Sequence, residues 1–250
     1  MPPPKRVPQT DAIFEQLKVV NPQADRADDT LRISIDAKAT VNIGPFSRRG
    51  RSRTRTKAAD HDFKPQATLT PFGIFLPRYD DLWLYMARSK VTSDFIVDRL
   101  EQWWKEVRLR FLSVKTLVIN LDNGPENQSR RTQFLKRIVG FARKYGLVVQ
   151  LAYYPPYHSK YNPVERCWGV LEMHWNGSLL DSVEAVIGFA RTMSWKGKNP
   201  TVGLIETRYV SGARLKPKEM KALESEVVRL PTLEKWFVKI PGGESSIRDG

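Results

Sequence analysis

Lys115-Thr-Leu-Val-Ile-Asn-Leu121, followed by Asp122-Asn-Gly, is the most apolar run in the middle of the chain. A continuous apolar run of this length is typical of a strand that is buried on both faces of a parallel sheet. An amphipathic helix pattern follows at Ser129–Tyr145, Gly146 ends it, and a second strand pattern follows at Leu147–Leu151. This strand–helix–strand order indicates an α/β fold.

The segments on either side of this unit add strands and helices. The strand patterns are Leu31–Asp36, Thr40–Ile43, Pro71–Leu76, Leu82–Met86 and Trp236–Ile240, of which the third and fourth predict a hairpin. The helix patterns are Ala12–Val20, a helix that begins at Thr92 or Ser93, Val183–Trp195 and Lys216–Val227. A hairpin followed by strand–helix–strand units predicts a mixed β-sheet with helices packed on both faces.

The composition is strongly basic. The 250 residues include 41 Lys and Arg against 27 Asp and Glu, a net charge of +14, which favours a polyanionic partner: nucleic acid first, an anionic membrane surface second. The single cysteine, Cys167, excludes a disulfide framework and a cysteine zinc site. We find neither a signal peptide nor a membrane-spanning stretch, so we expect a cytoplasmic protein without a membrane partner.

One basic run stands out, at residues 48–57. It has six cations in ten positions and no apolar residue: Arg48, Arg49, Arg51, Arg53, Arg55 and Lys57. Such a run is either a solubilising surface loop or a contact for phosphates, and the net charge of the chain favours phosphates.

A second unusual stretch runs from Tyr153 to Trp168. Pro163 suits the first position of a helix, and Asn162 before it can cap the free amides. Glu165 then lies in the first helical turn, where it has two interpretations. It is either a capping-box residue paired with Asn162 or a metal-binding carboxylate, and Glu172 on the same helical face is a rival acid.

Three acids occupy comparable places in the predicted fold. Asp36 ends the first strand, Asp122 ends the central strand and Glu165 begins a later helix. Sites in open α/β sheets gather at the carboxyl ends of strands, and Mg²⁺ prefers carboxylate oxygens. Separately, Asp36 could be a polar-face strand residue and Asp122 a turn residue. Together they predict a site for two metal ions that acts on phosphodiesters.

The motifs around these acids resemble the DDE transposases of bacterial insertion sequences, in the branch that neighbours the mariner-like elements. The resemblance rests on Ile33–Lys38, Leu117–Gly124 and the pattern Pro155-Pro-x-x-Ser-x-x-Asn-x-x-Glu165, and it covers about residues 10–240. It implies an RNase H-like fold of the retroviral-integrase superfamily and a cofactor of Mg²⁺ or Mn²⁺. It also implies nicking at element ends, followed by attack of the freed 3′-hydroxyl on target DNA.

Carried over by position, the resemblance makes Asp36, Asp122 and Glu165 the catalytic metal ligands. It gives the other residues supporting or DNA-binding roles: Asn123 and Asn162 support the ligands, and His158, Ser159, Lys160 and Arg166 line the DNA path. The implied partners are double-stranded DNA, as element ends and target, and further copies of the chain on that DNA. Such enzymes normally carry a helix-turn-helix region, which we do not find here, so a separate N-terminal DNA-binding region or partner is implied, as is association with the nucleoid.

We therefore expect three parts: an N-terminal leader at 1–30, an RNase H-like DDE catalytic domain at 31–200, and a C-terminal helical extension with a flexible tail at 201–250. The expected function is metal-dependent DNA cleavage and strand transfer. Two alternatives remain: an RNase H-like nuclease that cuts without rejoining, and a non-catalytic DNA-binding remnant of a transposase.

Overall fold

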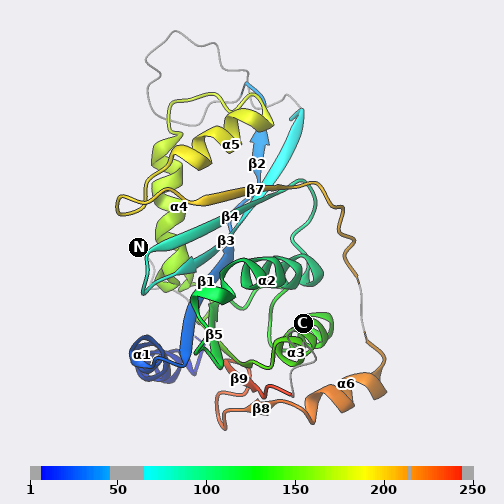
Figure 1. Cartoon of the computed structure of the whole chain (residues 1–250). Helices are drawn as coiled ribbons and strands as arrows, with labels where there is room; N and C mark the ends of the chain where they lie inside the picture. The colour runs from blue at the N-terminus through cyan, green and yellow to red at the C-terminus, as the bar shows by residue number, and fades with distance from the viewer. Residues whose placement is uncertain (1–6, 46–64, 213–214, 244–250) are drawn as a thin grey trace. The chain divides into compact units, whose positions relative to one another are not determined.

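The computed structural model describes residues 7–45, 65–212 and 215–243. The chain divides into two compact units (Figure 1). Unit 1 comprises Met1–Ile35, Thr92–Asn162 and Val210–Gly250, and unit 2 comprises Asp36–Val91 and Pro163–Tyr209. Of the four divisions, one falls inside a strand and another directly before a helix, and each unit is assembled from segments that are distant in the sequence.

Unit 1 is built on a sheet with the strand order β1-β5-β6-β9-β8. Its strands are β1 (Thr30–Ala37, which ends in unit 2), β5 (Thr116–Leu121), β6 (Val148–Tyr153), β8 (Val228–Arg229) and β9 (Phe237–Ile240). β1, β5 and β6 run parallel, whereas β9 is antiparallel to both β6 and β8. The apolar run of the central strand is buried as predicted, because β5 has a parallel neighbour on each side and helices over its faces.

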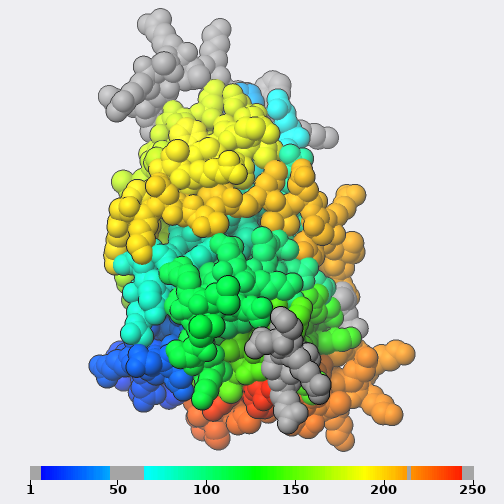
Figure 2. Space-filling model, viewed as in Figure 1, coloured from blue at the N-terminus to red at the C-terminus, as the bar shows by residue number. Residues whose placement is uncertain are grey.

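The helices of unit 1 lie on both sides of this sheet (Figure 1). They are α1 (Thr10–Arg26), α2 (Ser93–Val107), α3 (Thr132–Tyr145) and α6 (Pro217–Glu224), with short 3₁₀ turns η1 (Arg108–Arg110) and η2 (Ser159–Tyr161). The hydroxyl of Thr92 caps α2 by accepting from the N–H of Phe95 at 3.2 Å. Gly146 ends α3 in a left-handed conformation with φ of 63°. Helix α6 has no buried residue and lies at the surface (orange in Figure 2).

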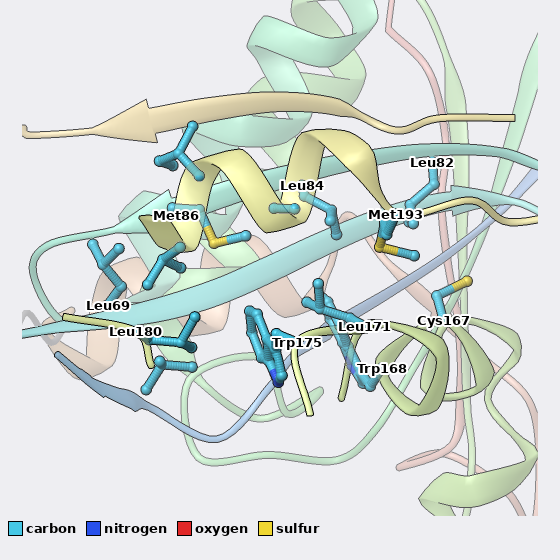
Figure 3. Close-up of a cluster of buried hydrophobic side chains, with 14 of the residues drawn as sticks. Leu69, Leu82, Leu84, Met86, Cys167, Trp168, Leu171, Trp175, Leu180 and Met193 are labelled. Atoms are coloured by element: carbon cyan, nitrogen blue, oxygen red, sulfur yellow. The ribbon is translucent and has the colours of Figure 1, made fainter. Parts of the chain in front are cut away.

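In its described residues, 36–45, 65–91 and 163–209, unit 2 has four strands and two helices besides the end of β1. They are β2 (Val41–Ile43), β3 (Ala67–Leu76), β4 (Asp81–Ala87), β7 (Thr201–Ile205), α4 (Pro163–His174) and α5 (Val183–Thr192). β3 and β4 form the predicted antiparallel hairpin, β2 pairs with β3, and β7 adds a parallel strand to β4. Figure 3 shows the core of this unit, in which Trp168 and Leu171 of α4, and Trp175 directly after it, pack with Leu84 and Met86 of β4.

The prediction of an α/β fold with a mixed sheet and helices on both faces is confirmed. Helix α1 is longer than the predicted Ala12–Val20 segment. Its polar second half lacks apolar periodicity, but it is held by tertiary contacts: Asn21 accepts from the side chain of Asn120 at 2.9 Å, and Asp25 binds Arg32 at 2.7 Å. The sequence analysis also missed β7 and β8.

None of the helices in the described residues combines the length and the apolar character needed to cross a membrane. The tail beyond residue 243 and the basic run at 48–57 lie outside the described residues. The predicted domain boundaries stay a prediction. In the described residues between 201 and 243, the structure has helix α6 and the strands β7, in unit 2, and β8 and β9, in unit 1.

Candidate active site

Asp36 lies at the end of β1, where its carboxylate is held by a tryptophan. The indole Nε1–H of Trp168 donates to Asp36 Oδ2 at 2.8 Å, and Asp36 is only 8% exposed. The polar side of β1, which alternation alone would place in solvent, is buried along its length, since Arg32 and Ser34 are buried as well. A buried carboxylate with a fixed orientation is suited to binding a ligand rather than to solubilising a strand.

Glu165 lies in the first turn of α4 and is half-buried. Pro163 opens the helix, as predicted. The residue before it, Asn162, is fully buried and bonds to β1: its Oδ1 accepts the hydroxyl of Ser34 at 2.6 Å, and its Nδ2 donates to the carbonyl of Ile35 at 3.0 Å. The side chain of Asn162 therefore ties the loop before α4 to β1, a role that differs from the capping box.

Glu172, the rival acid, has a structural environment. Its Oε1 lies 2.6 Å from Lys38 Nζ, and its Oε2 accepts the indole Nε1–H of Trp175 at 2.8 Å. The side chain of Lys38 is 13% exposed, so Glu172 neutralises a cation that is largely withdrawn from water. These two contacts occupy both oxygens of Glu172 and favour Glu165 as the acid on α4 that acts on a ligand.

Asp122 follows β5 and is held by its own loop. The Nδ2 of Asn127 donates to Asp122 Oδ1 at 2.9 Å, and the carbonyl of Asn127 accepts the hydroxyl of Tyr153 at 2.7 Å. Complete burial raises the pKa of Tyr153 well above its usual value, so the phenol stays a neutral donor. A Cβ at Gly124 would lie 3.1 Å from Asn127 Oδ1 and 3.3 Å from Asp122 Oδ2. Any larger residue at this position would therefore displace the amide of Asn127 and the carboxylate of Asp122 slightly.

The groups around Asp122 fit a hard cation. The amide oxygens of Asn123 and Asn127 are buried and have no hydrogen-bond partner among the described residues. Carboxylate and amide oxygens are the ligands that Mg²⁺ and Mn²⁺ prefer, and a buried oxygen without a donor gains from a cation. Over residues 7–45, 65–212 and 215–243, no three His, Cys, Asp or Glu side chains form a group that could hold a metal ion.

The predicted DNA-path residues separate into two kinds. His158 is 6% exposed; its Nδ1 lies 2.8 Å from the carbonyl of Pro156, and its ring packs edge-on against Phe14 of α1 at 5.5 Å between centroids. Ser159 is half-buried at the start of η2. By contrast, Lys160 and Arg166 are exposed and carry charge at the surface. His158 thus packs inside the loop, and the two cations are the residues with free access to a polyanion.

Two of the three predicted acids, Asp36 and Glu165, belong to unit 2, and Trp168 joins the end of β1 to α4 one helical turn after Glu165. Asp122 belongs to unit 1, so the convergence of all three acids stays a prediction. The sequence analysis missed Ser34, Asn127 and Trp168. The position of Trp168, three residues after Glu165 and hence on the same face of α4, was the available signal.

Known proteins with similar structures share this arrangement of strands and helices. The Mos1 transposase paired-end complex with left transposon end matches with a TM-score of 0.50 and 11% identity, over 74% of this chain and 54% of that one. The Mos1 mariner paired end complex with Mn matches with a TM-score of 0.50 and 10% identity, over 73% and 54%. The chain therefore spans about half the length of these proteins. A comparison with curated proteins gave no match.

The fold is that of the RNase H-like transposases. Residues 2–241 match a family described as the Rhodopirellula transposase DDE domain, which is nearly the whole chain. The chain belongs to this family.

Proposed function

We propose that this chain is the catalytic domain of a transposase that cuts DNA and transfers the cut strand, with Asp36, Asp122 and Glu165 as its metal ligands. One observation carries the proposal. β1 and β5 are adjacent parallel strands whose register pairs Ser34 with Asn120, and Asp36 and Asp122 are each the second residue after this pair. Parallel strands in register end at one edge of a sheet, which supports a shared place for the two carboxylates.

Helix α4 would bring Glu165 to the same place as Asp36 and Asp122. Asn162 ties the loop before this helix to Ser34 and Ile35 of β1, and Trp168 donates to Asp36 from its second turn. Both contacts lie within three residues of Glu165. They support a position for Glu165 near the end of β1, where Asp36 lies.

The three carboxylates, with the amide oxygens of Asn123 and Asn127, would hold Mg²⁺ or Mn²⁺. Bound there, these ions would polarise the phosphodiester and activate the attacking oxygen. The protein's part is to hold the ligands: Trp168 orients Asp36, Asn127 orients Asp122, and Tyr153 supports the loop that carries Asn127.

The proposed reaction has two steps on DNA. In nicking, a water oxygen attacks phosphorus and the bond to the 3′ oxygen breaks, which leaves a 3′-hydroxyl and a 5′-phosphate. In strand transfer, that 3′ oxygen attacks a target phosphodiester and displaces the target's own 3′ oxygen. One similar protein was solved as a paired-end complex with a left transposon end and another as a paired end complex with Mn, which supports element ends as one substrate and more than one copy of the chain in the active assembly.

The decisive test compares wild type, Glu165→Gln and Glu172→Gln for Mg²⁺-dependent nicking and joining of labelled DNA. We expect an active wild type, a folded but inactive Glu165→Gln and an active Glu172→Gln. Loss of activity in Glu172→Gln alone would make Glu172, and not Glu165, the third metal ligand. Cleavage without joining of the labelled end to a plasmid would favour a nuclease, and DNA binding without cleavage by the wild type would favour a DNA-binding remnant.

Phosphate contact by the basic run at 48–57 is tested by salt dependence. Replacing Arg48, Arg49, Arg51, Arg53 and Arg55 by Ala should lower the slope of log Kd against log salt by about 0.9 for each lost phosphate contact. An unchanged slope would show that the run only solubilises the chain.

A further inference from the structure

Trp168 combines burial, a tight fit and a bond to a carboxylate. It is 4% exposed, and its Nε1–H donates to Asp36 Oδ2 at 2.8 Å. An indole N–H can only donate, so its partner must offer an acceptor oxygen. Burial of both residues makes this bond stronger than a surface contact and restricts the rotation of the carboxylate.

The ring of Trp168 packs against β3 at Gly73, where the strand has no side chain. A Cβ on Gly73 would lie 2.8 Å from Cη2 and 3.0 Å from Cζ2 of Trp168, and 2.9 Å from Cγ2 of Val164. These distances are too short for a real side chain, so glycine is the residue that lets α4 approach β3 so closely. The ring lies in the core of unit 2 (Figure 3), which fixes its orientation and therefore the direction of its N–H.

We propose that Trp168 is a positioning residue of the active site: its indole N–H sets the orientation in which Asp36 presents its carboxylate to a divalent metal ion. The inference rests on the proposed function and extends it to a residue that bonds to a ligand rather than to the ion. Partners of this kind typically change metal affinity or activity by about 10–100-fold when they are removed.

The position of Trp168 on α4 has a second consequence. Glu165 precedes it by three residues, so both side chains project from the same face of the helix. A shift of α4 moves Glu165 and the donor that holds Asp36 together. The helix thereby couples the placement of two ligands.

A matched pair of substitutions tests the proposal. Trp168→Phe removes the N–H that bonds Asp36. Trp175→Phe makes the same chemical change directly after the same helix and in the same core, and it removes an indole bond to the carboxylate of Glu172 instead. The Mn²⁺ dissociation constant of each variant would be measured by electron paramagnetic resonance of the free ion, and the thermal unfolding of each without metal would report stability.

We expect Trp168→Phe to weaken Mn²⁺ binding about 10-fold or more, Trp175→Phe to stay within about twofold of wild type, and both to lose similar stability. Cleavage by Trp168→Phe should recover at high Mn²⁺, which a merely structural defect would not do. Equal Mn²⁺ affinity in Trp168→Phe and wild type would overturn the positioning role and leave the proposed function intact. Equal weakening in both variants would also overturn it, since core packing would then be the cause.

A wild type that binds no Mn²⁺ would overturn the proposed function, and the positioning role with it. If Trp168→Phe does not fold, the wild type answers the question by nuclear magnetic resonance. Among the seven indole N–H signals, that of Trp168 should be broadened first as Mn²⁺ is added. Equal broadening of all seven would overturn the proposal.

Discussion

Lys38 and Glu172 form an ion pair with 2.6 Å between Nζ and Oε1, and the lysine is the more buried partner. Lys38 follows Asp36 by two residues, and Glu172 follows Glu165 by seven. Both members of the ion pair are thus near a proposed metal ligand in the sequence, but neither is a proposed ligand itself. The carboxylate of Glu172 therefore has a structural role, which is to neutralise the charge of Lys38.

Replacing Glu172 by Gln should therefore reduce stability and leave catalysis in place. Lys38 would keep a largely buried charge without its counter-ion, so we expect the free energy of unfolding to fall by about 1–3 kcal/mol in urea denaturation. Glu184→Gln, on the exposed side of α5, is the control and should change it by less than about 0.5 kcal/mol. Unchanged stability of Glu172→Gln would mean that the pair contributes nothing.

The buried amide of Asn162 should be among the most sensitive positions for stability. Asn162→Ala deletes the bonds to Ser34 and Ile35 and leaves buried polar groups without partners, so we expect a loss of about 2–4 kcal/mol in urea denaturation. Asn176→Ala, an exposed asparagine after α4, should be close to neutral. Similar stability of both variants would contradict the role of Asn162 in tying the loop to β1.

Gly124→Ala should act on the site more than on the fold. Its Cβ would press on Asn127 and on the carboxylate of Asp122, so we expect Mn²⁺ binding to weaken by about 10-fold, as for other changes around a ligand. Gly140→Ala on α3 is the matched control: a Cβ there meets nothing within 4 Å, and the change should stabilise the helix by about 0.5–1 kcal/mol. Unaltered metal binding in Gly124→Ala would remove Asp122 from the ligand set.

The single thiol should be unreactive in the folded protein. Burial raises the pKa of Cys167 from 9.0 to about 12, so almost no thiolate exists at pH 8, and a disulfide reagent should label the chain only after denaturation. Because the folded pKa is the higher one, the neutral thiol contributes stability below pH 9 that is lost as the pH rises toward 12. Cys167→Val should show a flatter loss of stability above pH 9. Fast labelling of the native protein at pH 8 would contradict the burial of the thiol.

Much of the fold could be predicted from the sequence, because its main elements carry strong local signals. The apolar run of β5, the hairpin of β3 and β4, and the Thr92 cap of α2 each follow from side chains that are neighbours in the chain. β7 and β8 could not be predicted in this way. β7 is mostly half-buried and contains a glycine, so its strand conformation depends on pairing with β4, more than a hundred residues earlier.

The sequence alone indicated the kind of chemistry that we propose, because three acids follow or precede apolar elements in a chain with a net charge of +14. It left Glu165 and Glu172 open, and it gave Asn162 a capping role. Only the tertiary structure gave the polar partners of these side chains: Lys38 and Trp175 bind Glu172, and Asn162 bonds to β1. The physical reason is that local patterns fix backbone conformation, whereas the partners of a buried polar side chain come from segments far away in the sequence, which meet only when the chain folds.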